Sequence, residues 1–249
     1  MKQLTANVFV ETEQRGSNHG LVTTSDGLVM IDGPHKPSDA LRLKADIARR
    51  GPLRYILNTE PHGDHWTANA FFDVPVVAHE GVRSRILETD MTAHLARVAT
   101  FGPDEPRLLE GYRANAPVIT FQSEMTLHVG NHTFRMINMP GHTPYQAAVV
   151  VEEEGVVFTS DNVFCKVHTW LQEADPDLWS QALGSLRELR AETLVPGHGP
   201  VCDKRYLNEQ DAFIREWVDY VRKAIERGMT KDQCVADLTA LTDRYPMDV

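Results

Sequence analysis

Short segments in which apolar residues alternate with polar ones, or form a brief apolar run, recur along most of this chain and predict β-strands. Two of the intervening turns, Ser25-Asp26-Gly27 and Gly130-Asn131, have the composition of tight hairpin turns. We therefore expect a chain rich in β-structure, with several strands joined directly. Strands are predicted over residues 7–12, 19–24, 28–31, 54–57, 74–78, 118–121, 125–129, 133–139, 147–151, 156–159 and 193–195.

Longer segments with roughly helical spacing separate and follow these strands. Helices are predicted over residues 37–50, 176–190, 204–227 and 231–241. Residues 80–112 are polar and helical in pattern, so a helical insertion that can cover a site is expected over 80–117. Strands and helices come in two similar waves, without a linker or a fixed-period repeat. We therefore expect one α/β domain over residues 1–249, with two β-rich layers flanked by helices and C-terminal helices over 204–249.

Histidine and carboxylate side chains gather in polar turns and at the ends of predicted strands, where ligands commonly bind in α/β sheets. Several of these turns contain Gly or Pro, and donors on such a restricted backbone lose little entropy on binding a metal. If residues 60–65 are extended, Glu60, His62 and Asp64 point the same way, and Asp64 with His65 offers two donors from a tighter turn. The donors are Glu60, His62, Asp64, His65, His142, Asp161 and His198. This set predicts a metal site.

Three residues close to these donors in sequence are candidates for contact with a substrate. His168 follows the Asp161 segment, and Trp66 and Tyr145 each follow a donor turn. Ordinary packing is the alternative for all three. The other histidines are interpreted as surface or core residues; they are His19, His35, His79, His94, His128 and His132.

The donor pattern resembles the metallo-β-lactamase superfamily, which includes glyoxalase II, lactonases, arylsulfatases and the β-lactamases. Its first motif is His-x-His-x-Asp-His, and residues 60–65 match it except at Glu60. The later histidine, the bridging aspartate and the last histidine of the family fall on His142, Asp161 and His198.

The resemblance extends over about residues 8–200, and it includes Asp32, which matches an acidic residue that supports the site from outside the ligand set. It implies an αββα sandwich with two metals at one edge. The implied first site is Glu60, His62 and His142; the implied second site is Asp64, His65 and His198, with Asp161 bridging.

Glu60 is the departure from the family pattern. Two His and one Glu form a known catalytic zinc set, so Glu60 can serve as a ligand of the first site. With both implied sites filled, two Zn²⁺ per chain are expected. The oxygen ligand moves the metal preference somewhat toward Mn²⁺ or Fe²⁺. The charges of two divalent ions, the carboxylates of Glu60, Asp64 and Asp161, and a bridging hydroxide sum to zero, whereas the same centre with His at position 60 has a charge of +1. Compared with that family pattern, we expect weaker Lewis acidity of the metals and a higher pKa of the bound water. Glu60 pointing away, with a mononuclear or degenerate centre, is the alternative.

Composition narrows the classes of partner. The chain has 25 Lys and Arg against 35 Asp and Glu, a net charge of −10, which argues against nucleic-acid binding. Its apolar runs fall far short of the roughly 20 residues that span a bilayer. Glu11, Glu13 and Arg15 interrupt the N-terminal segment where a signal peptide needs apolar residues, so we expect a cytoplasmic protein without membrane partners.

We therefore expect a metal-dependent hydrolase in which a metal-bound hydroxide, oriented by Asp64 or Asp161, attacks an ester, lactone, thioester or amide of a small-molecule substrate. The alternatives are β-lactamase-like activity, a di-iron or mononuclear-iron oxidoreductase, and a non-catalytic metal-binding module on the same fold. Apolar residues of the C-terminal helices leave room for a homodimer; they are Phe213, Ile214, Trp217 and Val221.

Overall fold

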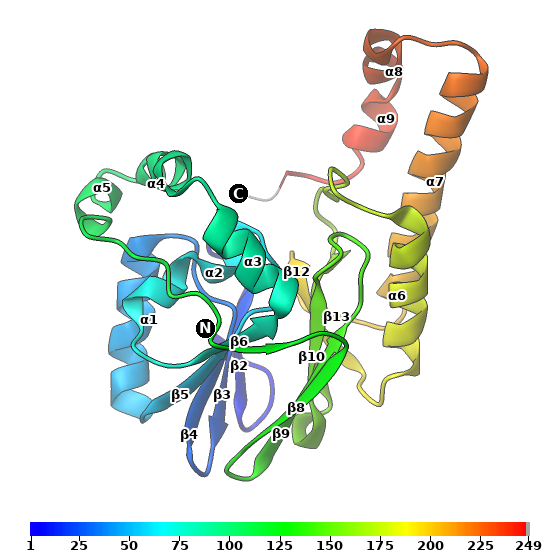
Figure 1. The fold of residues 1–249 in the computed structure, drawn as a ribbon. Helices are drawn as coiled ribbons and strands as arrows, with labels where there is room; N and C mark the ends of the chain where they lie inside the picture. The colour runs from blue at the N-terminus through cyan, green and yellow to red at the C-terminus, as the bar shows by residue number, and fades with distance from the viewer. Residues whose placement is uncertain (248–249) are drawn as a thin grey trace.

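The computed structural model describes residues 1–247 and contains two β-sheets packed face to face (Figure 1). The first sheet has the strand order β1-β2-β3-β4-β5-β6-β7 and changes from antiparallel to parallel pairing at β4. Its strands are β1 (Lys2–Gln3), β2 (Val8–Glu11), β3 (His19–Thr24), β4 (Gly27–Ile31), β5 (Leu53–Leu57), β6 (Val76–His79) and β7 (Ile119–Phe121).

The second sheet has the order β13-β12-β11-β10-β9-β8 and is antiparallel except for the parallel pair β11 and β12. Its strands are β8 (Glu124–Val129), β9 (His132–Asn138), β10 (Ala147–Val151), β11 (Val156–Phe164), β12 (Thr193–His198) and β13 (Cys202–Asp203). The parallel pair places the C-terminal ends of β11 and β12 side by side, and both strands carry predicted donors there.

Helices cover the outer face of each sheet (Figure 1). On one side, α1 (Pro37–Arg50) packs Leu43 and Ile47 against the first sheet. On the other side, α6 (Pro176–Glu188) and α7 (Tyr206–Glu226) pack against the second sheet. The remaining helices are α2 (Gly63–Trp66), η1 (Thr67–Phe71), α3 (Glu80–Glu88), α4 (Met91–Ala99), α5 (Glu105–Leu108), η2 (Glu152–Glu154), α8 (Lys231–Asp237) and α9 (Thr239–Thr242).

Apolar side chains from both sheets form the central core. Val22 and Leu57 of the first sheet belong to one buried cluster with Phe134, Val149 and Val195 of the second. Because every second residue of a strand faces the same way, the other face of each sheet is free to pack against helices. The layers are therefore helix, sheet, sheet, helix, and the predicted αββα sandwich is confirmed.

The predicted helical insertion corresponds to α3, α4 and α5, which lie above one end of the sandwich (Figure 1). After α5, residues 109–118 contain no helix or strand, so the helical part is shorter than the pattern predicted. Asp90 caps the start of α4 through hydrogen bonds from the backbone N–H groups of Thr92 and Ala93.

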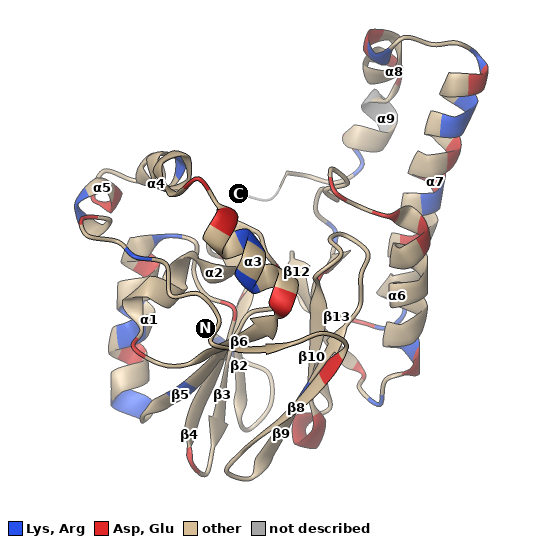
Figure 2. Cartoon of the chain, in the orientation of Figure 1, with Lys and Arg blue, Asp and Glu red and all other residues tan. Residues whose placement is uncertain are grey.

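The C-terminal helices offer less apolar surface than their sequence pattern indicates. Ile214 is fully buried beneath α7, and Phe213 is almost fully buried, with its ring against Tyr245. Of the four residues considered for a homodimer, Val221 is exposed. Lys and Arg are interspersed with Asp and Glu along α7 (Figure 2), where Arg215 pairs with Asp211. Among the described residues, no helix combines the length and apolar character needed to cross a membrane.

Candidate metal centre

All seven predicted donors meet at one end of the sandwich. Glu60 and His62 follow β5, Asp64 and His65 lie in α2, and His142 lies in the turn between β9 and β10. Asp161 is in β11, and His198 is the last residue of β12. The approach of β12 to β11 requires a glycine at position 197, because an added Cβ there would overlap the Asp161 carboxylate.

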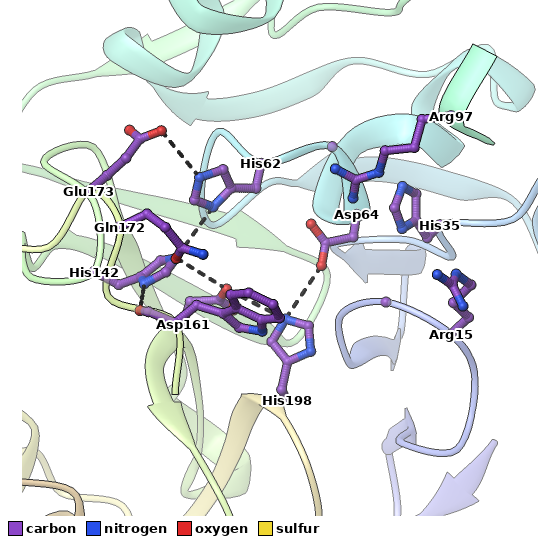
Figure 3. Close-up of a pocket in the computed structure, with 13 residues that line it drawn as sticks. Arg15, His35, His62, Asp64, Arg97, His142, Asp161, Gln172, Glu173 and His198 are labelled. Atoms are coloured by element: carbon purple, nitrogen blue, oxygen red, sulfur yellow. Dashed lines mark hydrogen bonds and ion pairs between the residues drawn. The ribbon is translucent and has the colours of Figure 1, made fainter. Parts of the chain in front are cut away.

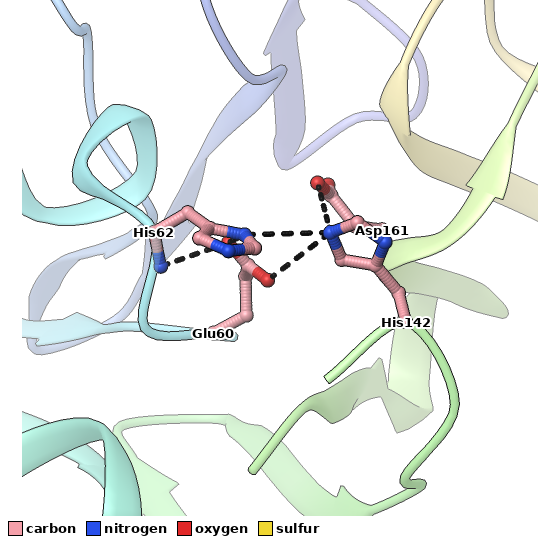
Figure 4. A group of neighbouring side chains, drawn as sticks. All are labelled: Glu60, His62, His142 and Asp161. Carbon is pink, nitrogen blue, oxygen red and sulfur yellow. Dashed lines mark hydrogen bonds and ion pairs between the residues drawn. The ribbon is translucent and has the colours of Figure 1, made fainter. Parts of the chain in front are cut away.

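The first group of donors consists of Glu60, His62, His142 and Asp161, with one donor atom of each within 4.8 Å of the others (Figure 4). His62 Nδ1 lies 2.8 Å from Glu60 Oε1 and 3.3 Å from His142 Nε2. His142 Nε2 also lies 3.6 Å from Asp161 Oδ2. Glu60 is fully buried and its carboxylate points into the group, so the structure does not match the alternative in which Glu60 turns away.

The second group consists of Asp64, His65 and His198. His198 Nε2 lies 3.4 Å from Asp64 Oδ2 and 3.5 Å from Asp161 Oδ2. His65 Nε2 lies 3.2 Å from Asp161 Oδ1. Asp161 therefore contacts histidines of both groups, which is the position that a bridging ligand needs.

The donor set fits a pair of divalent cations. Three buried atoms make no hydrogen bond within the described part of the chain: Glu60 Oε2, His65 Nε2 and Asp161 Oδ1. Unpaired polar atoms at such depth are costly unless a further partner binds them. Carboxylate oxygens and imidazole nitrogens are ligands for zinc, manganese and iron.

The electrostatics of the two groups are dominated by charge pairing. Glu60 raises the pKa of His62 to about 9. Burial alone would lower the pKa of His65, but the carboxylates of Asp161, Glu60 and Asp32 raise it well above its ordinary value. Burial alone would raise the pKa of Asp161, but His198 and His65 lower it strongly. Without a cation the centre thus pairs the anionic Asp161 with protonated imidazoles, and a bound cation would replace those protons.

Contacts behind the donors fix the orientation of three imidazole rings. His65 Nδ1 lies 2.9 Å from Asp32 Oδ2, and His142 Nδ1 lies 2.8 Å from the backbone oxygen of Trp170. His62 Nε2 faces Glu173 at 3.6 Å. Each ring thus has one nitrogen held from outside and the other directed at the donor group, an arrangement that selects the tautomer suited to a metal.

The 60–65 segment is not extended throughout, and this corrects the orientation that its spacing suggested. Residues Gly63–Trp66 form the single helical turn α2, which directs Asp64 toward His198 rather than alongside Glu60 and His62. The turn forms because the backbone N–H of His65 donates to the carbonyl of His62, and Asn58 holds the carbonyl of His65 through its side-chain amide. The motif therefore divides between two groups of donors.

A cavity of about 420 Å³ opens onto the two groups (Figure 3). Its lining includes residues that the sequence did not single out, because their chain segments are distant from the motif. The lining residues are Arg15, Gly16, His35, His62, Gly63, Asp64, Arg97, His142, Asp161, Trp170, Gln172, Glu173 and His198. His35, interpreted from the sequence as a surface or core residue, belongs to this lining.

The three residues considered for substrate contact lie outside this lining. Trp66 is buried, donates its indole N–H to the carbonyl of Pro61 and stacks on His94. Tyr145 stacks on His79. The backbone N–H of His168 bonds to the carbonyl of Pro246, and its ring packs edge-on against Trp170.

The fold and the donors define a metal-binding protein of the αββα class. The chain belongs to the metallo-beta-lactamase superfamily, because the model of that family matches residues 12–198, most of the chain.

Relatives agree with this assignment. The chain is 28% identical over 176 residues to a hydroxyacylglutathione hydrolase of Methylococcus capsulatus, covering 65% of this chain and 58% of that protein. It is 29% identical over 215 residues to a beta-lactamase-like protein 2 homolog of Caenorhabditis elegans, covering 85% and 65% respectively. The chain thus spans about three fifths of the length of the curated relatives that it matches.

Solved structures with low sequence identity share the fold. A metallo-beta-lactamase from Pontibacter korlensis superposes with a TM-score of 0.67 at 22% identity, covering 86% of this chain and 97% of that one. The sec-alkylsulfatase Pisa1 from Pseudomonas sp. superposes with a TM-score of 0.74 at 16% identity, covering 97% of this chain and 46% of that one.

Proposed function

We propose that this protein is a metal-dependent hydrolase that cleaves an ester, lactone, thioester or amide bond in a small molecule. The observation that carries the proposal is the convergence of seven donors on two groups joined by Asp161, with buried atoms of Glu60, His65 and Asp161 that accept or donate no hydrogen bond among the described residues. Two divalent cations, zinc first, fit these donors. When bound, such ions supply Lewis acidity and a water of lowered pKa.

The chain's own residues supply orientation and proton handling. Asp64 and Asp161 both line the cavity, so their carboxylates can orient an attacking water and accept its proton. Gln172 lies on the side of His142, while Arg97 of α4 reaches the opposite side (Figure 3). Trp170 also lines the cavity, and its backbone oxygen contacts His142 Nδ1. A cavity of about 420 Å³ has the size of a small-molecule site.

One relative is named as a hydrolase, which supports hydrolysis as the class of reaction. Because the chain spans 58% of that protein, its substrate does not carry over. The proposal includes a cytoplasmic location, which is consistent with a metabolic substrate.

The test combines metal content with turnover. Elemental mass spectrometry on protein purified without added metal should give a ratio near two, and hydrolysis of at least one member of an ester, lactone, thioester and β-lactam panel should disappear with a chelator. Asp161→Ala should lose both metal and turnover, whereas Asp26→Ala, in an exposed turn where Asp26 pairs with Arg54, should retain both.

Each other outcome contradicts a specific part of the proposal. Two metals and full turnover in Asp161→Ala would refute the bridging role. A ratio near one would place the metal at Asp64, His65 and His198 alone. Bound iron with redox activity would indicate an oxidoreductase, and two metals without turnover on the whole panel would indicate a binding module.

A further inference from the structure

Two arginines reach the cavity from segments far apart in the chain. Arg15 lies in the loop between β2 and β3, and Arg97 lies in α4 of the helical insertion. Figure 3 shows both guanidinium groups on the same side of the cavity, near His35 and Asp64 and across from Glu173. We call Arg15, His35 and Arg97 the arginine recess.

Neither arginine of the recess has a carboxylate partner within ion-pair distance among residues 1–247. Other arginines of this acidic protein do: Arg54 pairs with Asp26, and Arg85 binds Glu173 through two contacts of 2.9 and 3.0 Å. Two guanidinium groups without a carboxylate partner, in a chain of net charge −10, place positive charge on the side of the cavity beyond Asp64.

Both arginine side chains are exposed, and the segments that carry them pack against neighbouring aromatic residues. The guanidinium carbon of Arg15 lies 4.3 Å from the centre of the Phe101 ring, a cation–π distance, and Phe101 packs edge-on against His35 at 4.7 Å. His94, one helical turn before Arg97, stacks on Trp66 and lies within hydrogen-bond distance of Thr67 Oγ1 at 2.9 Å. The Arg15 guanidinium thus lies against Phe101, and His94 anchors the α4 helix that carries Arg97 next to the metal-binding turn.

His35 supplies a third unsatisfied group. Its side chain is 3% exposed, it lines the cavity, and its Nε2 makes no hydrogen bond within the described residues. A Cβ at position 16 would overlap His35, so Gly16 allows the Arg15 loop to close over this ring. A buried imidazole without a partner, between two guanidinium groups, is suited to a ligand oxygen.

We propose that the arginine recess binds an oxyanionic group of the substrate, a carboxylate, sulfate or phosphate. This inference deepens the proposed hydrolase function and rests on it: the substrate carries an anion at the end that faces Arg15 and Arg97. The opposite wall offers no comparable attraction, because Glu173 there is already paired with Arg85. Glu60 in place of a neutral histidine also lowers the net charge of the loaded centre by one, and the two arginines add positive charge beside it.

The catalytic test compares two matched esters, the mono-4-nitrophenyl ester of glutarate and the neutral 4-nitrophenyl valerate. The wild type should favour the anionic ester in kcat/KM. Arg15→Gln and Arg97→Gln should each lower the ratio of anionic to neutral kcat/KM by about tenfold, mainly through KM, because each removes a charge-assisted hydrogen bond. The matched control Arg107→Gln, on α5 of the same insertion and outside the cavity lining, should leave the ratio unchanged.

A binding measurement separates failure of the recess from failure of the hydrolase. Calorimetry on the metal-loaded protein uses glutarate, sulfate and inorganic phosphate, with neutral glutaramide as the reference. At least one anion should bind, with about tenfold weaker affinity in each Arg→Gln variant and unchanged affinity in Arg107→Gln. The anion with the largest loss identifies the group that the recess takes.

The outcomes are distinct. No hydrolysis of either ester, together with arginine-dependent anion binding, would refute the hydrolase and retain the recess. Hydrolysis with an unchanged ester ratio in both variants, or anion affinities equal in wild type and variants, would overturn the recess and leave the hydrolase intact.

Discussion

Asp32 and His65 lie 33 positions apart in the chain, yet His65 Nδ1 is 2.9 Å from Asp32 Oδ2 at the base of the metal centre. The same carboxylate accepts hydrogen bonds from the backbone N–H and the hydroxyl of Thr59, at 2.9 and 2.6 Å. Asp32 therefore ties the end of β4 to the donor turn after β5. It also holds a proton on Nδ1 of His65 and leaves Nε2 for a cation.

Replacement of Asp32 by Asn should weaken metal binding at the second donor group by about 10- to 100-fold, because His65 loses its anionic partner. Asn is a suitable replacement since Asp32 has φ +53°, a backbone conformation that Asn also tolerates. Competition with a chromogenic chelator measures the affinity. Asp26→Asn serves as the control, and equal affinities in Asp32→Asn and wild type would mean that the Asp32 contact does not orient the ligand.

Glu60 sets the charge of the centre in our interpretation. The backbone N–H of His62 donates to Glu60 Oε1 at 2.9 Å, which turns the carboxylate inward and leaves Oε2 for a cation. Glu60→His should add one positive charge to the loaded centre, lower the pKa of its bound water and move the pH–rate profile toward lower pH. A profile that stays in place, at full metal occupancy, would show that Glu60 does not control this pKa.

Asn18 joins the two sheets beside the centre. Its side-chain amide donates to the carbonyls of Pro196 and Gly199, at 2.9 and 2.7 Å, and so holds the turn that carries His198. Asn18→Ala leaves two buried carbonyls unpaired, and the free energy of unfolding should fall by about 2–4 kcal/mol. Denaturant titration measures this loss.

The same variant should also bind metal more weakly, because His198 loses its support. Asn131→Ala is the matched control: Asn131 accepts a hydrogen bond from the backbone of Ser25 in an exposed turn, so its removal should cost less. Equal stability losses in the two variants would indicate that the Asn18 amide contributes no more than a surface contact.

His19 gives the fold a pH dependence that is separate from the metal centre. Burial lowers its pKa from 6.5 to about 4, against the smaller opposing effect of Glu11. The unfolded chain therefore binds this proton more readily than the folded one. The His19 contribution to stability is complete above pH 6.5 and falls by about 3 kcal/mol as the pH drops from 6.5 to 4.

Unfolding free energies of wild type and His19→Gln, measured across this range, check the expectation. The wild type should lose about 3 kcal/mol more than the variant between pH 6.5 and 4. Parallel pH curves for the two proteins would show that His19 titrates at its ordinary pKa in the folded state.

Local pattern predicted most of the regular structure. The strand over residues 147–151 and the helix ending at Arg50 agree with β10 and α1, because their apolar spacing and their Gly-Pro stop are local signals. The short strand Cys202–Asp203 was not predicted, since it exists through pairing with Thr193 and Leu194. The helical turn at Gly63–Trp66 extends the tighter turn expected at Asp64 and His65, and contacts with the side chain of Asn58 and the backbone of His62 stabilise it.

Residue types and their spacing in the turns at 60–65, 142, 161 and 198 are local information, and they suffice to predict the chemistry of the donors and the family. The division of the donors into two groups around Asp161, and the other side chains that reach the cavity, follow from the tertiary structure. Arg15, His35, Arg97 and Glu173 belong to four separate segments, and no local pattern indicates their meeting. Long-range packing brings them together, and we infer that it sets the substrate while the motif sets the reaction.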